Sequence, residues 1–583
     1  MIRKSPEMTR TLTKPAARCR QMFTKPLLAA MSLVTMPLTA MSLAASVCLS
    51  SSVYAADDVE SATDVSQSDS SRAEMSVVEF VDSMIQQGYD DNEVTSSPQA
   101  TDEEFLRRIY LDVIGRIPTM QEAEAYLADE NPRKKGILID ELLDSPDYVR
   151  HFTTVWTNHS IGRGQTRRVS RKGMTKFYRE TFARNRPWDE VVIDLVTAEG
   201  HFEENGAVNY TLAQMQMPDE AVQLTAKTAK LFLGMQVQCT QCHNHPFNNW
   251  QQSQFWEFNS FFRQVRKQDH RKFDEATGRQ VDDYSEVFTR DFSGPVYFEK
   301  RSGLMQVAYP IYNGEAIEPD AFDRRKEFAK LLVKADNGET PAIARAFVNR
   351  TWGQFFGYGF TRPVDDMGPH NPASHPEVLE RLSAEFVKAD YDVKQLIKWI
   401  ANTNAYSLTS QYGKTNDIDN PAAGEVPLFS HMYMKSMEAE QLYDSLIVAS
   451  SAHKAGRGGW EAQEAQRRRW MGQFFVAFDT DENDEATTFN GTIPQALMMM
   501  NSELMQKAVN ADRGSFLYET MTSKESDSKK VQKLYMASLS RQPTRAEMRN
   551  AGKLIGRYGP NRAAAYQDLF WALLNSNEFI FNH

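Results

Sequence analysis

The chain has 583 residues, of which 41% are hydrophobic and 25% are charged, as in ordinary soluble globular proteins. This length predicts roughly three or four structural units, because it exceeds what one core usually holds. With 77 acidic and 66 basic residues the formal net charge is −11. An acidic surface argues against a nucleic-acid partner, which needs a basic footprint.

Residues 1–55 have the features of a signal peptide. The segment is basic at its start, is apolar from Pro26 to Leu49, and ends in Val53-Tyr54-Ala55, which fits a cleavage site. We therefore expect cleavage after Ala55 and export to the periplasm or the cell exterior. A retained anchor is the alternative, but Pro37 and many Ser, Thr and Ala residues make this stretch a poor permanent span. No later run of eighteen apolar residues occurs, so no membrane span is expected after cleavage.

The next segments are a linker and a helical domain. Residues 56–76 are acidic and rich in Ser, which predicts a disordered linker. From residue 77 apolar residues recur at helical spacing. Thr101 to Glu104 reads as a capping box at the start of one helix, and Pro118-Thr119 with Glu122 marks the next. The helical pattern continues to residue 265.

Residues 266–320 differ, because Asp, Gly and Pro break the helical period. Val296-Tyr297-Phe298 and the stretch from Met305 to Tyr309 alternate like short strands. Helical spacing returns at residue 321 and continues to residue 583. The fold class predicted is therefore mainly α, with two helical domains (77–265 and 321–583) and a small β-containing insert (266–320) between them.

Cysteine usage points to one site. Two of the four cysteines leave with the signal peptide, and the other two lie in Cys239-Thr240-Gln241-Cys242-His243. A disulfide scaffold is excluded, and C-x-x-C-H is the attachment signal for c-type haem. Two thiols at this spacing reach the two vinyl groups of one macrocycle, and the adjacent His243 is then the proximal ligand of the haem iron.

Other uses of the motif stay open at this point. Cys239, Cys242, His243 and His245 are also residue types that bind zinc, although neighbouring ligands at 242 and 243 make one closed tetrahedron awkward. A simple disulfide or an inert C-x-x-C is a further alternative. If haem is bound, His245 is expected in the second shell or as a loop residue. The candidates for the distal ligand all lie upstream, although each is better explained as a surface or core residue: His151, His159, His201, Met215 and Met217.

A second group of residues is polar within apolar helical surroundings. These residues predict one polar pocket in the second helical domain, provided that their helices pack together: Arg345, Asn349, Arg350, Asp365, Asp366 and His375. The alternative is that Arg345 to Arg350 brace a helix. No Ser-His-Asp signature, phosphate loop or His-Glu-x-x-His helix is present, so hydrolysis has no motif of its own.

Several stretches of the first half resemble a planctomycete domain of unknown function, number 1549. They are Phe105-Leu106-Arg107-Arg108-Ile109-Tyr110-Leu111-Asp112-Val113-Ile114-Gly115-Arg116-Ile117-Pro118-Thr119, Asn185-Arg186-Pro187-Trp188-Asp189, and the C-x-x-C-H motif with its continuation Asn244-His245-Pro246-Phe247.

The second half resembles the usual companion of that domain, number 1553. The matching stretches are Ala344 to Trp352, Phe356 to Phe360, His375 to Leu379, Thr492 to Leu497, Ser540-Arg541-Gln542-Pro543-Thr544 and Asn575-Ser576-Asn577-Glu578-Phe579. One departure is Asp366-Met367-Gly368, where the family has Asp-Phe-Gly. The resemblance implies a secreted, cytochrome-associated protein and names no reaction.

The sequence therefore favours electron transfer through one haem c, in exchange with a redox partner protein. Two alternatives belong to other classes. One is a secreted binding or assembly protein whose motif is structural or holds zinc. The other is a component of an enzyme system that degrades extracellular polymers.

Overall fold

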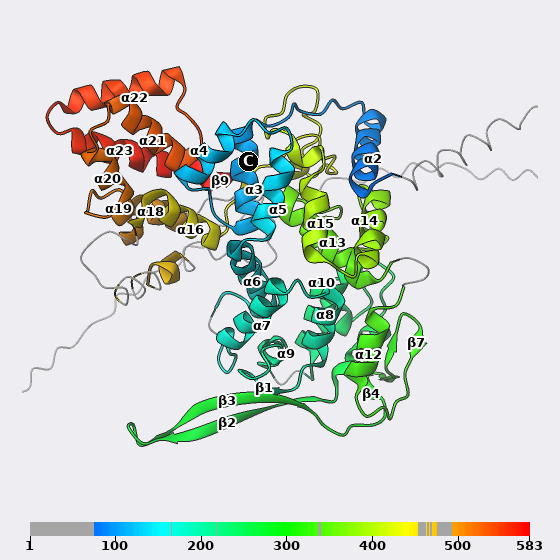
Figure 1. The fold of residues 1–583 in the computed structure, drawn as a ribbon. Coiled ribbons are helices and arrows are strands. Elements are labelled where there is room, and N and C mark those ends of the chain that lie inside the picture. Colours follow the sequence, from blue (N-terminus) through cyan, green and yellow to red (C-terminus); the bar gives the residue numbers. More distant parts are fainter. Residues whose placement is uncertain are drawn as a thin grey trace, which may run out of the picture. The chain divides into compact units, whose positions relative to one another are not determined.

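In the computed structural model, residues 75–164, 166–217, 220–335, 340–452, 462, 466, 469–474 and 493–583 are described, the last range with side chains from 497 onward. These residues belong to one compact unit. The signal peptide predicted at 1–55 and most of the linker predicted at 56–76 lie outside the described residues. Figure 1 shows the ribbon.

The first part of the chain is helical, as predicted. Its helices are α2 (Val77–Asp91), α3 (Asp102–Ile114), α4 (Met120–Ala128), α5 (Lys134–Leu143), α6 (Pro146–Ile161), α7 (Arg171–Ala183), α8 (Trp188–Thr197), α9 (Val208–Gln214), α10 (Val222–Leu233) and α11 (Gln252–Asn259), with the 3-10 turns η1 (Gln238–Gln241) and η2 (Ser260–Phe262).

Of the two capping boxes predicted here, one is complete and one is not. At Thr119 and Glu122 both reciprocal hydrogen bonds are present. Thr101 accepts a hydrogen bond from the Glu104 N–H, but the Glu104 carboxylate does not return to the cap. It accepts from Thr409 Oγ1 and the Ser410 N–H instead, so a long-range contact takes its place.

The β-containing region contains the strands predicted at 296–298 and 305–309, now β4 (Val296–Glu299) and β5 (Met305–Ala308), which pair antiparallel. The same region also holds β2 (Val265–Asp274), β3 (Arg279–Thr289), β6 (Ile311–Tyr312) and β7 (Glu315–Ala316), and β1 (Gly200–His201) precedes it in the chain. Strands β2 and β3 form a long hairpin that the sequence did not predict, and β1 pairs with the other edge of β3.

The last part is again mostly helical. Its helices are α12 (Arg324–Leu332), α13 (Ala342–Phe356), α14 (Pro376–Lys388), α15 (Val393–Ala401), α16 (Ala439–Ser450), α18 (Ile493–Asn501), α19 (Glu503–Ala508), α20 (Phe516–Thr522), α21 (Asp527–Leu539), α22 (Arg545–Tyr558), α23 (Arg562–Leu574) and α24 (Asn577–Ile580), with turns η3 (Ala405–Ser407) and η4 (Pro421–Ala423) and strands β8 (Lys435–Ser436) and β9 (Phe581–Asn582). The mainly α fold class is confirmed. No helix in the described part of the chain has the length and apolar character needed to cross a membrane.

Two hydrophobic cores hold these elements together. Each contains side chains from both sides of residue 320, where the β-containing region was predicted to end. The first core contains side chains from Val81 to Tyr433 and also Met536 of α21, and so includes residues from before and after the β-containing region. Within it, the ring centroids of Trp188 and Phe347 are 4.3 Å apart. The second core holds side chains from Met437 to Phe579 and also Leu111 of α3 and Ile117. Helix α3 therefore contributes to both cores.

Helix α3 also carries buried charged side chains that contact the far end of the chain. Arg107 donates to the Ser538 and Phe579 carbonyls at 2.9 and 2.8 Å. Arg108 donates to the Tyr406 carbonyl at 2.5 Å and to that of His583 at 3.1 Å. Burial lowers the pKa of Arg107 to about 10. Arg107 and Arg108 are thus structural anchors.

Asp112, which also lies on α3, is the centre of a buried group of hydrogen bonds. Its carboxylate accepts hydrogen bonds from Lys435 Nζ at 2.7 Å, Asn582 Nδ2 at 2.7 Å and the Tyr406 hydroxyl at 2.7 Å. Lys435 Nζ donates in addition to the carbonyls of Gln354 and Phe355. All three ammonium protons of Lys435 therefore have acceptors, as a buried charge requires.

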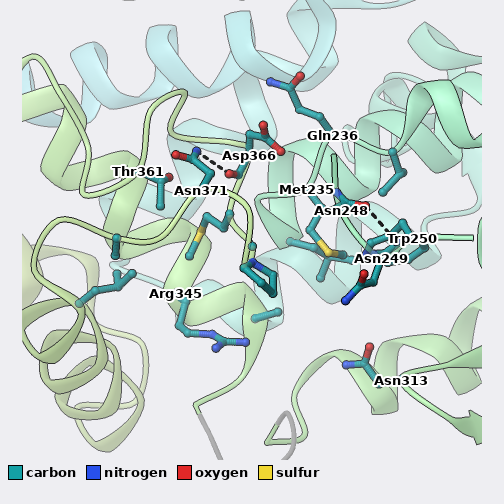
Figure 2. Close-up of a pocket in the computed structure, with 18 of the residues that line it drawn as sticks. Met235, Gln236, Asn248, Asn249, Trp250, Asn313, Arg345, Thr361, Asp366 and Asn371 are labelled. Carbon is teal, nitrogen blue, oxygen red and sulfur yellow. Dashed lines mark hydrogen bonds between the residues drawn. The ribbon is translucent and has the colours of Figure 1, made fainter. Parts of the chain in front are cut away.

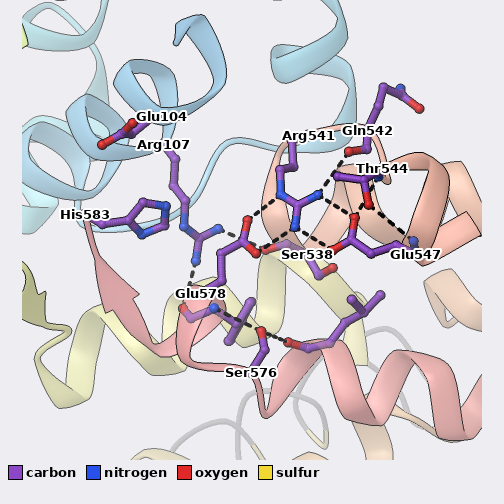
Figure 3. A network of polar contacts seen from close by, with 12 residues as sticks. Glu104, Arg107, Ser538, Arg541, Gln542, Thr544, Glu547, Ser576, Glu578 and His583 are labelled. Atoms are coloured by element: carbon purple, nitrogen blue, oxygen red, sulfur yellow. Dashed lines mark hydrogen bonds and ion pairs between the residues drawn. The ribbon is translucent and has the colours of Figure 1, made fainter. Parts of the chain in front are cut away.

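The C-terminal family-like stretches meet beside Arg107. Figure 3 shows Arg541 between two carboxylates, Glu547 and Glu578, to which its Nη2 donates at 2.9 and 2.8 Å. Glu547 also completes a capping box with Thr544. Ser540 to Thr544 and Asn575 to Phe579 therefore form one structural junction.

Candidate functional site

The C-x-x-C-H motif follows helix α10. The helix ends at Gly234, whose φ of 66° is the left-handed conformation that glycine adopts without a Cβ clash. The turn η1 then holds Cys239, and the Cys242 N–H donates to the Cys239 carbonyl at 3.3 Å. Both cysteines are free, with Cys239 partly exposed and Cys242 exposed. The two thiols are therefore open to a covalent partner.

His243 presents one ring nitrogen as a potential ligand. Its Nδ1 lies 2.6 Å from the Asn244 carbonyl oxygen. A carbonyl only accepts hydrogen bonds, so Nδ1 carries a proton, and in the neutral ring Nε2 then has the lone pair. Histidines that bind metals commonly have this arrangement, because the Nδ1 hydrogen bond fixes the tautomer and the ring orientation.

His245 has a different arrangement, which closes the loop after the motif. Its Nδ1 accepts hydrogen bonds from the N–H groups of Phe247 and Asn248 at 3.3 and 3.1 Å. Its backbone N–H donates to the Trp250 carbonyl at 2.8 Å. The Nδ1 lone pair is thus engaged. Among the described residues no group of three or more His, Cys, Asp or Glu side chains is arranged to hold a metal ion.

A segment from the second half, residues 361–371, lies against the motif. Asp366 Oδ1 is 3.1 Å from His370 Nε2, and the rings of His370 and His245 have centroids 5.7 Å apart. Burial and the nearby Asp366 carboxylate raise the pKa of the Cys239 thiol. Burial and the neighbouring His370 lower the pKa of His245. The thiol at 239 is therefore kept protonated.

A cavity of about 850 Å³ opens beside the motif (Figure 2). Val237 and Asn248, which flank the motif, line it, whereas Cys239, Cys242 and His243 are not among its lining residues. The side chains that line the cavity come from both halves of the chain, and they include Leu233, Met235, Gln236, Asn249, Trp250, Tyr312, Asn313, Arg345, Asp366, Met367, Leu379 and Glu380.

The six residues predicted to share one polar pocket lie in two cavities and in the core. Arg345 and Asp366 line the large cavity. Arg350 and Asp365 line a smaller one of about 170 Å³. The reason is the helical twist of α13, because residues five apart lie roughly 140° apart around the axis. The segment that carries Asp365 and Asp366 separates the two cavities.

The remaining two predicted pocket residues are structural. The Asn349 side chain is buried and bonds the Thr361 hydroxyl, the Val364 carbonyl and the Phe360 N–H at 2.8, 2.9 and 2.7 Å. His375 is buried against the rings of Phe360 and Phe429. The six residues therefore do not line one cavity, and the prediction of a single polar pocket is wrong. The alternative, in which residues of this stretch brace a helix, fits Asn349.

Two family models match this chain. PSCyt2, described as a protein of unknown function (DUF1549), matches residues 80–267, and PSD1, described as a protein of unknown function (DUF1553), matches residues 324–555. The chain belongs to the proteins that combine DUF1549 with DUF1553. Neither the curated proteins nor the solved structures gave a match.

Both family segments contribute residues to the candidate site. The DUF1549 segment supplies the motif and Trp250, while the DUF1553 segment supplies Arg345, Asp366 and His370. The sequence missed Trp250 and His370. The spacing of four residues between Asp366 and His370 could have indicated that the two side chains pair. Such a short pattern is too common in sequences to indicate a site without a structure.

None of the five distal candidates lines the large cavity. His151 and His159 line the small one, and burial lowers the pKa of both rings. His201 packs on Tyr284, and Met217 is exposed. Two other methionines do line the large cavity, Met235 of the DUF1549 segment and Met367 of the DUF1553 segment.

Buried His375 makes the stability of the protein dependent on pH. Burial lowers its pKa to about 4, against the small opposing effect of the Asp419 carboxylate. The unfolded chain then binds the proton more tightly, so this residue lowers stability as the pH falls from about 6.5 to about 4. Between about pH 7 and pH 4.5 we expect the wild type to lose about 2 kcal/mol more than His375→Met. Urea unfolding of both proteins at the two pH values measures this, and equal losses would contradict it.

Proposed function

We propose that this protein is an exported c-type haem protein that transfers electrons through one haem held by Cys239, Cys242 and His243. The observation that carries the proposal is the state of these three side chains. Both thiols are free and accessible, and the Nδ1 hydrogen bond of His243 leaves Nε2 for a metal.

The residues fit the chemistry of the group. Each thiol would add across one vinyl group, so that a C–S bond forms, the thiol proton goes to the other vinyl carbon, and no electrons are exchanged. His243 would bind the iron through Nε2, and Asn244 would hold its ring by accepting from Nδ1. When bound, the haem supplies a one-electron carrier.

The exposed side of the motif supports exchange with a partner. Cys242 is exposed and Phe247 of the same loop is 79% exposed. A redox partner protein could therefore approach the loop directly. Export rests on the signal-peptide features of residues 1–55, which also fit c-type maturation outside the cytoplasm.

The test is co-expression of the full chain with a c-type maturation system, followed by haem staining of a denaturing gel. The wild type should retain stain, because thioether bonds survive denaturation. Cys239→Ala with Cys242→Ala should lose it. His243→Ala should change the visible spectrum of any attached haem.

His245→Ala is the matched control, because the Nδ1 of His245 is engaged with the Phe247 and Asn248 N–H groups. It should keep the stain. Unstained wild-type protein from a strain that matures a control cytochrome would overturn the proposal, and stoichiometric zinc in that protein would select the binding-protein alternative.

A further inference from the structure

The large cavity is rich in amide side chains. Its volume of about 850 Å³ lies within the range of roughly 300 to 1,000 Å³ that is usual for small-molecule pockets. Trp250 lines it together with six amide side chains, which are Gln236, Asn248, Asn249, Gln254, Asn313 and Asn371. Figure 2 shows Trp250 with several of them. Amide groups are uncharged, and each offers both hydrogen-bond donors and an acceptor.

Two of these amides keep their donor ends for a ligand. Asn248 Oδ1 accepts from the Trp250 N–H at 2.9 Å, and Gln254 Oε1 accepts from the Gln251 N–H at 2.8 Å. The loop that carries Trp250 is fixed in turn, because its carbonyl accepts from the His245 N–H at 2.8 Å. The protein thus holds each amide by its oxygen, and the NH₂ groups of Asn248 and Gln254 donate to no other described residue.

Two further amides have the opposite arrangement and keep their acceptor ends. Gln236 Nε2 donates to Asp365 Oδ1 at 2.8 Å, and Asn371 Nδ2 donates to the Asp366 carbonyl at 2.8 Å. Gln236 Oε1 and Asn371 Oδ1 accept no hydrogen bond from any residue that the structure describes. The lining therefore presents donors and acceptors together.

The charges of the lining do not favour an anion. The charged side chains among the described lining residues are Arg345, Asp366 and Glu380, of which one is basic and two are acidic. Both carboxylates have donors of their own. Glu380 accepts from the Thr340 N–H and Oγ1 at 3.0 and 3.2 Å, and Asp366 is paired with His370 at 3.1 Å. A neutral polar ligand suits this lining best.

We propose that this cavity binds a neutral sugar or a short neutral oligosaccharide. A sugar hydroxyl both donates and accepts, so it matches a lining that presents both kinds of group. A pyranose ring also has an apolar face of C–H groups, which can pack on the indole of Trp250. An apolar ligand would instead cover the free amide ends without pairing them, which is unfavourable.

This inference does not rest on the proposed function. Cys239, Cys242 and His243 are not among the residues that line the cavity. A protein that carries Cys239→Ala and Cys242→Ala should therefore bind the sugar as tightly as the wild type.

The test is isothermal titration calorimetry of the full chain with four neutral trisaccharides: cellotriose, xylotriose, mannotriose and galactotriose. At least one should bind. Asn249 and Asn313 are exposed, and their side chains bond no other described residue, so replacing them should leave the fold intact. The double variant Asn249→Ala with Asn313→Ala should weaken binding roughly tenfold or more, because two hydrogen bonds to the ligand are lost.

Two further comparisons separate recognition from folding. Asn561→Ala, at an exposed asparagine just before α23, is the matched control and should leave binding unchanged. Trp250→Ala should weaken binding roughly tenfold or more, because the apolar packing surface is lost, and Trp250→Phe should keep part of the affinity. Far-UV circular dichroism checks that each variant is folded, and if Trp250→Ala is not, the double asparagine variant decides.

Two charged or peptidic ligands set the limits of the inference. Trigalacturonic acid should bind more weakly than the best neutral trisaccharide, because the lining has more acidic than basic side chains. Triglycine should not bind. No binding of any neutral trisaccharide, or binding that the asparagine and tryptophan variants leave unchanged, overturns the inference. Tighter binding of trigalacturonic acid or of triglycine overturns it as well.

The outcomes separate this inference from the proposed function. Sugar binding that depends on Asn249 and Asn313, in a protein that never attaches haem, keeps the inference and removes the proposed electron transfer. Haem attachment without sugar binding has the reverse meaning.

Discussion

Replacing Asp112 by Ala is expected to lower the free energy of unfolding by about 3 to 5 kcal/mol. The substitution leaves Lys435, a residue that is 5% exposed, buried without its carboxylate partner. It also leaves Asn582 Nδ2 and the Tyr406 hydroxyl without their acceptor. Unfolding in urea, followed by far-UV circular dichroism, measures the loss.

Two comparisons make this test specific. Asp91→Ala changes an exposed carboxylate at the end of α2 and should shift stability by no more than about 0.5 kcal/mol. Combining Asp112→Leu with Lys435→Met removes both charges and should recover part of the lost stability. If Asp112→Ala behaves like Asp91→Ala, the buried pair does not stabilise the fold.

Deleting residues 577–583 is expected to prevent stable folding altogether. The segment supplies the fully buried Phe579, whose loss alone should cost about 3 to 5 kcal/mol. It also supplies partners of three buried charges of α3: Arg107, Arg108 and Asp112. At about 1 to 3 kcal/mol each, the total approaches the roughly 5 to 15 kcal/mol by which proteins of this kind are stable.

The measurement is resistance to limited proteolysis, with His583→Ala as the control. Arg108 bonds the backbone carbonyl of His583, so the alanine variant keeps this acceptor whereas the deletion removes it. His583→Ala should be as resistant as the wild type. A truncated protein that resists protease equally would show that the C-terminal contacts of α3 are dispensable.

Local signals in the sequence were enough to predict most helices. Thr119 with Glu122 marked a true capping box, because both bonds form within one turn. The box at Thr101 was only half correct, since Glu104 bonds Ser410, 306 residues away. Sequence spacing carries no information about such a distant competitor.

The hairpin β2–β3 was missed for a related reason. Its strands have mostly charged faces joined by cross-strand pairs, such as Lys272–Asp283 at 2.9 Å and His270–Glu286 at 2.7 Å. The apolar alternation that marks a half-buried strand is therefore weak. The shorter strands β4 and β5 were predicted correctly, and in β4 the buried and exposed residues do alternate.

At the candidate site the sequence predicted the residues of the motif but not their surroundings. Cys239, Cys242 and His243 are adjacent in the chain, so their spacing was readable. The cavity depends on how α13 packs beside the loop at Trp250, which joins residues about a hundred positions apart. Arg345 and Arg350 appeared equivalent in sequence, and only the packed helix separates them.

The contacts of helix α3 also constrain when the protein can fold in the cell. Arg108 and its acceptor at His583 are 475 residues apart in sequence, which a ribosome takes roughly half a minute to a minute and a half to synthesise at about 5 to 20 residues per second. Until then the first family segment lacks the groups that satisfy its buried charges. The packing of α3 can therefore be completed only after the C-terminal segment has been synthesised, and until then α3 carries buried charges that lack these partners.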